Sequence, residues 1–211
     1  MDFRRIIAVG DIHGCYRRFM SLWQKMDYEP DADFLIFLGD YIDRGSEPTK
    51  VLSFVAGLVG ENCVALRGNH EEMFIDYFDA DPYIMEYFGG KNQALRYRSF
   101  IESLPVSHGL SARGKSYFFC HGGVMPGVPL ELQKSNVLLW IREEYYENYT
   151  GDTIVVSGHT PTPFIEPGRY TPIIKPNMIL LDTGSYLPEG HISAIDVLTG
   201  EYWQSDGGIP I

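Results

Sequence analysis

The sequence predicts an α/β fold, a four-layer α/β/β/α sandwich in which two packed mixed sheets are flanked by helices. Three observations lead to this prediction. Apolar runs and helical patterns alternate early in the chain, five apolar runs end in glycine and a polar residue, and strand-like runs return in the last third. With 45% hydrophobic and 21% charged residues in 211, and no linker, the composition suits a single domain over residues 1–211 and excludes a disordered chain.

The first three apolar runs, at 5–9, 34–38 and 63–66, are separated by two helical patterns. The first pattern is Phe19, Leu22, Trp23 and Met26, and the second is Val51, Leu52, Val55, Leu58 and Val59. Apolar residues at i, i+3, i+4 and i+7 are typical of a helix with one buried face. The result is a β-α-β-α-β unit, whose helical crossovers make neighbouring strands parallel.

The rest of the chain carries more helix and then more strand. The segment 72–104 is predicted to be mostly helical, and apolar runs at 117–120 and 153–156 read as strands four and five. Because parallel strands end at one edge of a sheet, we expect the polar ends of all five strands to meet there. Runs at 178–181 and 191–197 in the last third predict a second sheet.

Glycine and side chains able to bind metal follow each of these five strands. The candidate ligands are Asp11, His13, Asp40, Asn69, His121 and His159. Three imidazoles, two carboxylates and one amide oxygen suit Mn, Fe or Zn and suit Ca poorly. Asp and His are also common in turns, so no single residue carries the argument. Six of them at five successive strand ends indicate two metals that share a bridging carboxylate.

Charge and cysteine content narrow the partners and the compartment. The formal charge of −11 argues against nucleic acid as a partner, because a phosphate backbone is bound mainly by positive charge. No apolar run reaches the roughly 18 residues that span a bilayer, so no membrane partner is expected. Cys15, Cys63 and Cys120 form no C-x-x-C pair, which favours a reducing, cytoplasmic location. The oligomeric state has no signature in the sequence.

Three blocks at the strand ends resemble the signature blocks of the metal-dependent phosphoprotein phosphatases, a branch of the calcineurin-like metallophosphoesterases. They are Gly10-Asp11-Ile12-His13-Gly14, Gly39-Asp40-Tyr41-Ile42-Asp43-Arg44-Gly45 and Arg67-Gly68-Asn69-His70-Glu71. The similarity extends to His121, Trp140-Ile141-Arg142-Glu143, Gly158-His159-Thr160-Pro161 and Leu181-Asp182-Thr183-Gly184. In compactness and in the Trp140 block the chain is most similar to the small bacterial and bacteriophage lambda-type serine/threonine protein phosphatases.

The resemblance implies a metal assignment. Asp11 and His13 would hold one divalent metal with Asp40, which bridges to a second metal. The second metal would be held by Asn69, His121 and His159. Mn²⁺ is the first choice, with Fe or Zn as alternatives. Attack by a metal-bridging hydroxide fits the absence of a Cys-x5-Arg loop in the sequence.

The departing alkoxide needs a general acid, and His70, next to Asn69, is the candidate. The resemblance implies that Asp43 orients His70 and raises its basicity. Planar guanidinium groups match phosphate oxygens, and Arg44 and Arg142 are the predicted donors. The predicted phosphate-binding set is Arg44, Arg142, Arg67 and Asn69, with a structural ion pair as the alternative for Arg67.

The predicted substrate is a phosphoserine or phosphothreonine side chain of a protein, with phosphotyrosine as a further option. The first alternative is a symmetrical diadenosine tetraphosphate hydrolase, since Gly14-Cys15-Tyr16 resembles theirs. Those enzymes generally carry Asp in place of Glu71 and lack the Asp-Arg-Gly ending found here at 43–45.

The second alternative is an inactive relative that binds a phosphoprotein. The intact His70, Asp43 and phosphate arginines argue against it. His191 is left out of the site, because six ligands complete the pattern. Substrate discrimination is expected in the rim loops 79–91 and 124–135.

Overall fold

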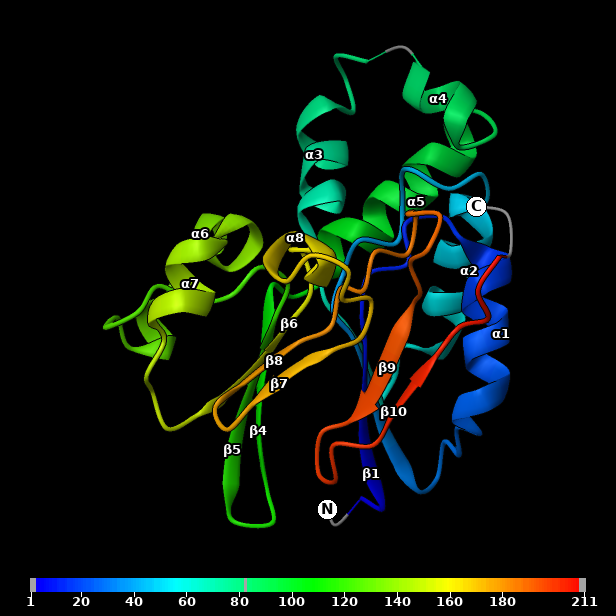
Figure 1. Cartoon of the computed structure of the whole chain (residues 1–211). Helices are drawn as coiled ribbons and strands as arrows, with labels where there is room; N and C mark the ends of the chain where they lie inside the picture. The colour runs from blue at the N-terminus through cyan, green and yellow to red at the C-terminus, as the bar shows by residue number, and fades with distance from the viewer. Residues whose placement is uncertain (1–2, 82, 209–211) are drawn as a thin grey trace.

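The computed structural model describes residues 3–81 and 83–208, and within them two five-stranded sheets pack face to face (Figure 1). The first sheet has the order β10-β9-β1-β2-β3 and the second β4-β5-β6-β8-β7. Helices cover both outer faces: α1 and α2 lie beside the first sheet, and α6 and α7 beside the second (Figure 1). The predicted four-layer sandwich is confirmed.

The first sheet contains the predicted β-α-β-α-β unit. Its strands are β1 (Arg5–Val9), β2 (Asp33–Phe37), β3 (Cys63–Ala65), β9 (Ser193–Asp196) and β10 (Tyr202–Gln204). The helices that connect or follow the first three strands are α1 (Tyr16–Met26), α2 (Pro48–Leu58), α3 (Asn69–Tyr77), α4 (Tyr83–Tyr87) and α5 (Lys91–Ser103). Strand β1 pairs in parallel with β2, and β2 with β3, as the helical crossovers require.

The prediction that 191–197 joins the second sheet is wrong. Strand β9 pairs antiparallel with β1 and extends the first sheet, with Ala8 opposite Ile195. Apolar patterning predicts that a strand forms but not which strand it pairs with, because this pairing joins residues nearly two hundred positions apart.

The second sheet contains β4 (Ser107–Ala112), β5 (Lys115–Cys120), β6 (Ile154–Ser157), β7 (Ile173–Lys175) and β8 (Met178–Leu180). Short helices accompany it: η1 (Leu130–Leu132), α6 (Ser135–Trp140), α7 (Glu143–Asn148) and α8 (Thr162–Ile165). The five predicted strand ends are therefore divided between two sheets, three and two, instead of lying along one. They still meet, because the two sheets present these ends at the same end of the sandwich (Figure 1).

Alternation along β1 explains the two hydrophobic layers of the first sheet. Ile7 and Val9 pack with the core under α1 and α2, whereas Ile6 and Ala8 pack against the second sheet. A strand buried on both faces is continuously apolar, which is the pattern of the first three apolar runs. On the helical side, Phe19 lies fully buried on the predicted face of α1.

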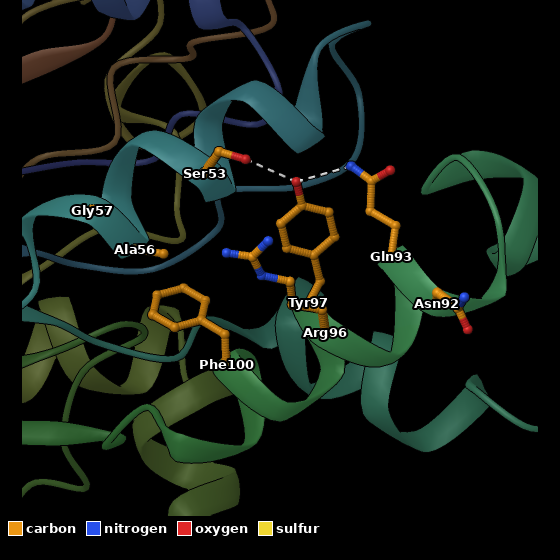
Figure 2. A pocket seen from close by; sticks show the side chains of 8 residues that line it. All are labelled: Ser53, Ala56, Gly57, Asn92, Gln93, Arg96, Tyr97 and Phe100. Atoms are coloured by element: carbon orange, nitrogen blue, oxygen red, sulfur yellow. Dashed lines mark hydrogen bonds between the residues drawn. The ribbon is translucent and has the colours of Figure 1, made fainter.

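A cavity of about 670 Å³ lies between α2 and α5, away from the predicted site residues. Figure 2 shows Ser53 and Gln93 both directed at the Tyr97 hydroxyl. That hydroxyl lies 2.8 Å from Ser53 Oγ and 3.2 Å from Gln93 Nε2, and it donates to the Thr49 carbonyl. These contacts fix α5 against α2 and hold the helical layer together.

At the opposite end of β1, a buried carboxylate joins the first two strands. Asp33 accepts hydrogen bonds from the guanidinium groups of Arg4 and Arg5 and from the Glu29 backbone N–H. Burial raises the pKa of Asp33, but the bonds from Arg5 and Arg4 outweigh burial and lower it to about 2. The carboxylate is therefore ionised in the folded chain at any pH near neutrality.

An Asp33→Asn variant should lose about 2 kcal/mol of unfolding free energy at pH 7, because a pKa lowered from 3.8 to about 2 is worth that much. Since the folded pKa is depressed, this contribution is present above about pH 4 and disappears as the pH falls toward 2. Urea unfolding at pH 7 and at pH 3 should show the difference from the wild type shrinking with acid. The exposed Asp31→Asn change is the matched control; an equal loss there would contradict the assignment.

No helix in the described ranges 3–81 and 83–208 combines the length and apolar character needed to cross a membrane.

Candidate active site

A cavity of about 410 Å³ opens at the end of the sandwich where the five strand ends meet. It is lined by His13, Asp40, Arg44, Asn69, His70, Arg142, Glu143, Tyr146, His159, Thr160, Pro161, Phe164, Asp182 and Tyr186. Seven of these were predicted as site residues from the sequence. Asp11 and His121 are buried and lie close to the donors that line the cavity.

The three predicted imidazole ligands are held in the same way. One ring nitrogen of each lies within hydrogen-bond distance of a backbone carbonyl: Nδ1 of His13 at Ile42, Nδ1 of His121 at Leu38, and Nε2 of His159 at Trp140. An N–H at that position donates to the carbonyl and leaves the lone pair of the other nitrogen facing the site. This is the arrangement typical of metal-binding histidines.

The inner nitrogens lie close to side-chain oxygen atoms of Asn69 and Asp40. Asn69 Oδ1 lies 2.7 Å from His121 Nε2 and 2.8 Å from His159 Nδ1. Asp40 Oδ1 lies 3.4 Å from His121 Nε2, and Asp40 Oδ2 lies 3.4 Å from His13 Nε2. The two oxygens of Asp40 thus face different imidazoles, as a carboxylate shared between two cations requires.

Donor atoms also cluster in two groups within 4.8 Å, Asp11 with Asp40 and His121, and His13 with Asp40 and His70. Both groups contain Asp40. The second group includes His70, which was predicted as an acid and not as a ligand.

The site concentrates buried negative charge. Burial, followed by the charges of Asp182 and Asp40, raises the pKa of Asp11. Burial opposes ionisation of Asp40 too, but the surrounding imidazoles, His121 foremost, lower the pKa of Asp40. Among the described residues, the charge contacts of Asp11 and Asp40 are with histidines alone. Buried carboxylates without lysine or arginine partners fit divalent cations, because an uncompensated buried charge is costly.

Backbone strain is concentrated at the same place. Among the described residues, seven other than glycine have positive φ, and five of them are predicted site residues. These five are His13, Asp40, Asp43, Arg44 and His159, with φ between 48° and 68°. Such conformations cost about 1–3 kcal/mol each and persist where the surrounding structure enforces them.

Two glycines allow close approach to the predicted ligands. A methyl group at Gly68 would overlap Asp40 Oδ1, and one at Gly158 would overlap Asp11 Oδ1. Each glycine thus makes room for a carboxylate that comes from a different strand end.

Glu71 was not predicted as a site residue, yet it supports the loop that carries Asp40. Its fully buried carboxylate accepts the backbone N–H groups of Asp40, Tyr41, Ile42 and Gly68. In the sequence, Glu71 resembles any acidic residue in the first turn of a helix. The strand-end pattern alone contains no sign of this role.

Glu71→Gln should lower the free energy of unfolding by about 2–4 kcal/mol, because the new amide group places a donor against backbone N–H donors. Metal affinity should fall with it, since Asp40 loses its support. Urea unfolding and metal titration measure both effects. Glu72→Gln, which alters the half-buried partner of Arg67, is the control, and comparable losses there would refute the proposed support of Asp40.

His70 and Asp43 form a hydrogen-bonded pair at the cavity wall. His70 Nδ1 lies 2.5 Å from Asp43 Oδ2, and His70 Nε2 lies 3.9 Å from Asp40 Oδ2. Burial lowers the pKa of His70, but the bond to Asp43 and the nearby carboxylates raise it, and the net direction is upward. With Nδ1–H donating to Asp43, Nε2 faces the cavity and can hand over a proton there.

Arg44 and Arg142 line the cavity on two sides. Arg44 lies over the Tyr186 ring, 5.3 Å from its centroid, and Tyr186 also lies edge-on to His13. Arg142 donates from Nη1 to the His159 carbonyl and to Thr160 Oγ1. No other hydrogen bond of this guanidinium is found within residues 3–81 and 83–208, so its remaining N–H groups suit a phosphate, as the predicted role of both arginines requires.

Arg67 is placed differently from the phosphate-binding role predicted for it. Its guanidinium donates to the Glu72 carboxylate and to the carbonyls of Glu102 and Leu104. It is not among the described side chains that line the cavity. The structural alternative suits Arg67, because an arginine beside a buried strand can satisfy helix ends instead of substrate.

Two further residues were left open or missed. His191 lies outside the cavity lining, and its Nδ1 is 2.8 Å from the Ser205 carbonyl. Asp182 lines the cavity, and burial, followed by the charge of Asp40, raises its pKa to about 6. Asp182 follows the apolar run at 178–181 and precedes Gly184, so the same strand-end pattern could have identified it.

Comparison with known proteins agrees with this geometry. The sequence profile of the calcineurin-like phosphoesterases matches residues 4–193. The chain belongs to this family. Metallophosphoesterases use a dinuclear metal centre, and the clustered donors around Asp40 are a set that can hold such a centre.

The curated relatives of this metallophosphoesterase act on different phosphoesters. Serine/threonine-protein phosphatase 2 of Salmonella typhimurium is 38% identical over 88 residues, 42% of this chain and 39% of that protein. An asymmetrical bis(5'-nucleosyl)-tetraphosphatase of Geobacillus thermodenitrificans is 27% identical over 194 residues, 74% of this chain and 78% of that protein. The chain spans less than half the length of the first curated relatives it matches.

Solved structures confirm the metallophosphoesterase fold. A candidate diadenosine tetraphosphatase superposes with a TM-score of 0.76 at 21% identity, covering 96% of this chain and 93% of that one. A serine/threonine phosphatase of Saccharomyces cerevisiae superposes with a TM-score of 0.64 at 17% identity, covering 92% and 73%. At such identities these likenesses concern the fold alone.

Proposed function

We propose that this metallophosphoesterase is a phosphomonoesterase that removes phosphate from phosphoserine and phosphothreonine, and from phosphotyrosine as a further substrate, in proteins. The His70–Asp43 pair carries the proposal. A serine or threonine alkoxide is a poor leaving group that needs a proton, whereas the nucleotide leaving a dinucleoside polyphosphate needs little help. Because Asp43 holds His70 in place as an acid, the site is better suited to the phosphate ester of an alcohol than to a dinucleoside polyphosphate.

Six residues would hold two divalent cations: Asp11, His13 and Asp40 for one, and Asp40, Asn69, His121 and His159 for the other. When bound, the cations supply Lewis-acid activation of the attacking water and of the phosphate. Mn²⁺ is our first choice, with Fe and Zn as alternatives, because the donors are nitrogen and oxygen with no thiolate.

The protein residues then divide the remaining work. Arg44 and Arg142 bind the phosphate oxygens that face away from the cations and offset charge as it develops. His70 Nε2 gives its proton to the departing oxygen, while Asp43 holds the ring and stabilises its charged form. Asn69 Oδ1 lies beside the inner nitrogens of both imidazoles of the second cation group, which suits its proposed role as a ligand there.

A dinucleoside polyphosphate hydrolase is the second candidate. It is favoured by a symmetrical bis(5'-nucleosyl)-tetraphosphatase of Aromatoleum aromaticum, 30% identical over 128 residues. The second alternative is an inactive relative that binds a phosphoprotein. Such a protein would not need the His70–Asp43 pair together with the two phosphate-binding arginines. A cytoplasmic location remains part of the proposal, supported by three free, buried cysteines.

A side-by-side turnover assay with Mn²⁺ tests the proposal. Phosphoserine, phosphothreonine and phosphotyrosine peptides are compared with diadenosine tetraphosphate, each with a chelated control. Peptide hydrolysis that disappears with chelator supports the protein phosphatase. If the dinucleotide is cleaved and the peptides are not, the proposed metal centre stands but the proposed substrate is wrong. Inactivity toward all of these substrates would favour the inactive, phosphoprotein-binding alternative.

A further inference from the structure

One hydrogen bond joins helix α4 to Asp43, the carboxylate member of the proposed acid pair. The backbone N–H of Asp43 donates to the hydroxyl of Tyr87, at 3.0 Å, from the last residue of α4. Tyr87 lies in the predicted rim loop 79–91, which the structure folds in part as this helix. It is 44 positions from Asp43 in sequence and does not line the catalytic cavity in the described ranges.

The backbone at Asp43 and Arg44, here called the Asp43–Arg44 corner, is strained. Asp43 and Arg44 have consecutive positive φ values of 65° and 67°. On one side the corner is held by the Gly45 N–H, which donates to the carbonyls of Asp43 and His13. On the other side the described contact of the Asp43 N–H is the Tyr87 hydroxyl. A strained corner keeps its geometry only where such contacts enforce it.

One cluster of aromatic side chains, Phe74, Tyr87 and Phe88, connects the two members of the acid pair. His70 and Phe74 lie one turn apart on α3, so they share a helix face. Phe74 packs on buried Phe88 with ring centroids 4.8 Å apart, and Tyr87 packs on Phe88 at 4.9 Å. Phe74 and Phe88 therefore hold the turn of α3 that carries His70 and also hold Tyr87 in position.

Tyr87 is suited to a fixed, neutral role. Burial, followed by the charge of Asp43, raises the pKa of Tyr87 to about 12, so its hydroxyl stays protonated and accepts the backbone N–H throughout the working pH range. Its ring also borders a hollow of about 220 Å³ beside Asp43, and the residue is 41% exposed.

We propose that Tyr87 is a positioning residue, which holds the Asp43 end of the Asp43–Arg44 corner so that the carboxylate orients His70 for proton donation. The inference rests on the proposed function only in that His70 acts as the acid. It does not depend on whether the ester belongs to a peptide or to a nucleotide.

Tyr87→Phe tests the role, because it removes the hydroxyl and keeps the ring. We expect kcat for an alkyl phosphate to fall about five- to tenfold with KM little changed, the effect of losing one positioning hydrogen bond. An aryl phosphate, whose leaving group needs less protonation, should fall less than twofold by the same reasoning. Tyr83→Phe removes a hydroxyl from a residue of the same helix that is 74% exposed, and it is the matched control.

A double-mutant cycle with Asp43→Asn separates this inference from the proposed function. If Tyr87 acts through Asp43, Tyr87→Phe should cause no further loss in the Asp43→Asn background. Equal loss on alkyl and aryl phosphates, or full additivity with Asp43→Asn, would overturn the positioning role. If Asp43→Asn itself leaves the alkyl-to-aryl ratio unchanged, the acid pair of the proposed function fails instead.

Discussion

Replacing His70 by asparagine is expected to lower kcat for a phosphoserine peptide by about 10²- to 10⁴-fold, the usual contribution of a general acid. The loss should be much smaller for an aryl phosphate, because a phenolate leaves without full protonation. Steady-state kinetics on both substrates, at saturating Mn²⁺, measures the difference.

The same variant decides how His70 relates to the cations. His70 belongs to one of the two donor clusters, but its nearest approach to Asp40 is 3.9 Å and its Nδ1 is occupied by Asp43. We expect His70→Asn to retain two metals per chain. Loss of one metal would make His70 a ligand and remove it from the role of acid. His191→Asn, outside the cavity lining, is the matched histidine control and should keep both activity and metal.

Removal of the divalent cations is expected to lower turnover by at least about 10³-fold, since metal catalysis is worth several kcal/mol of transition-state stabilisation. The melting temperature should fall by about 10 °C if the metals bind with Kd a thousandfold below their concentration. The structural reason is that Asp11 and Asp40 are buried and, in the part of the chain that the structure describes, have no lysine or arginine partner. Dialysis against chelator, then calorimetry and reconstitution, measures both effects.

Asp40→Asn refines this experiment. Because each Asp40 oxygen faces a different imidazole, its replacement should weaken both metal positions and abolish activity even with excess metal. Asp43→Asn, in the same loop, should retain full metal content. Retention of two tightly bound metals by Asp40→Asn would contradict the bridging role.

That these residues meet in one site could be predicted, because a short local sequence pattern marks each strand end. A short apolar run followed by glycine and a ligand-type residue specifies both the end of a strand and the direction of the next side chain. Asp11, Asp40 and His121 were accessible to that argument, and the structure places them within a few ångströms of one another. The bounds of β1, β2 and β3 followed from the same patterns to within one residue, whereas β10 was not predicted.

What escaped prediction depends on contacts between distant segments. Strand β9 pairs with β1, and β5 and β6 form a separate sheet, because pairing is decided by packing that periodicity does not record. Glu71 and Tyr87 act through backbone N–H groups, which any acceptor at the right place can satisfy. Arg67 has the same chemistry as Arg44, and only the neighbouring Glu72 and helix carbonyls distinguish their roles.

The division of the ligands between two sheets has a mechanical consequence. Asp11 belongs to the first sheet and His159 to the second, 148 positions later, and the His159 backbone N–H already donates to Asp11. Cations held between such residues would act as a cross-link that closes a long chain loop, and the entropy lost by the partly open state would stabilise the closed sandwich. A metal centre at this place would therefore also hold the two sheets together, and partial unfolding that separates the sheets would have to release the cations first.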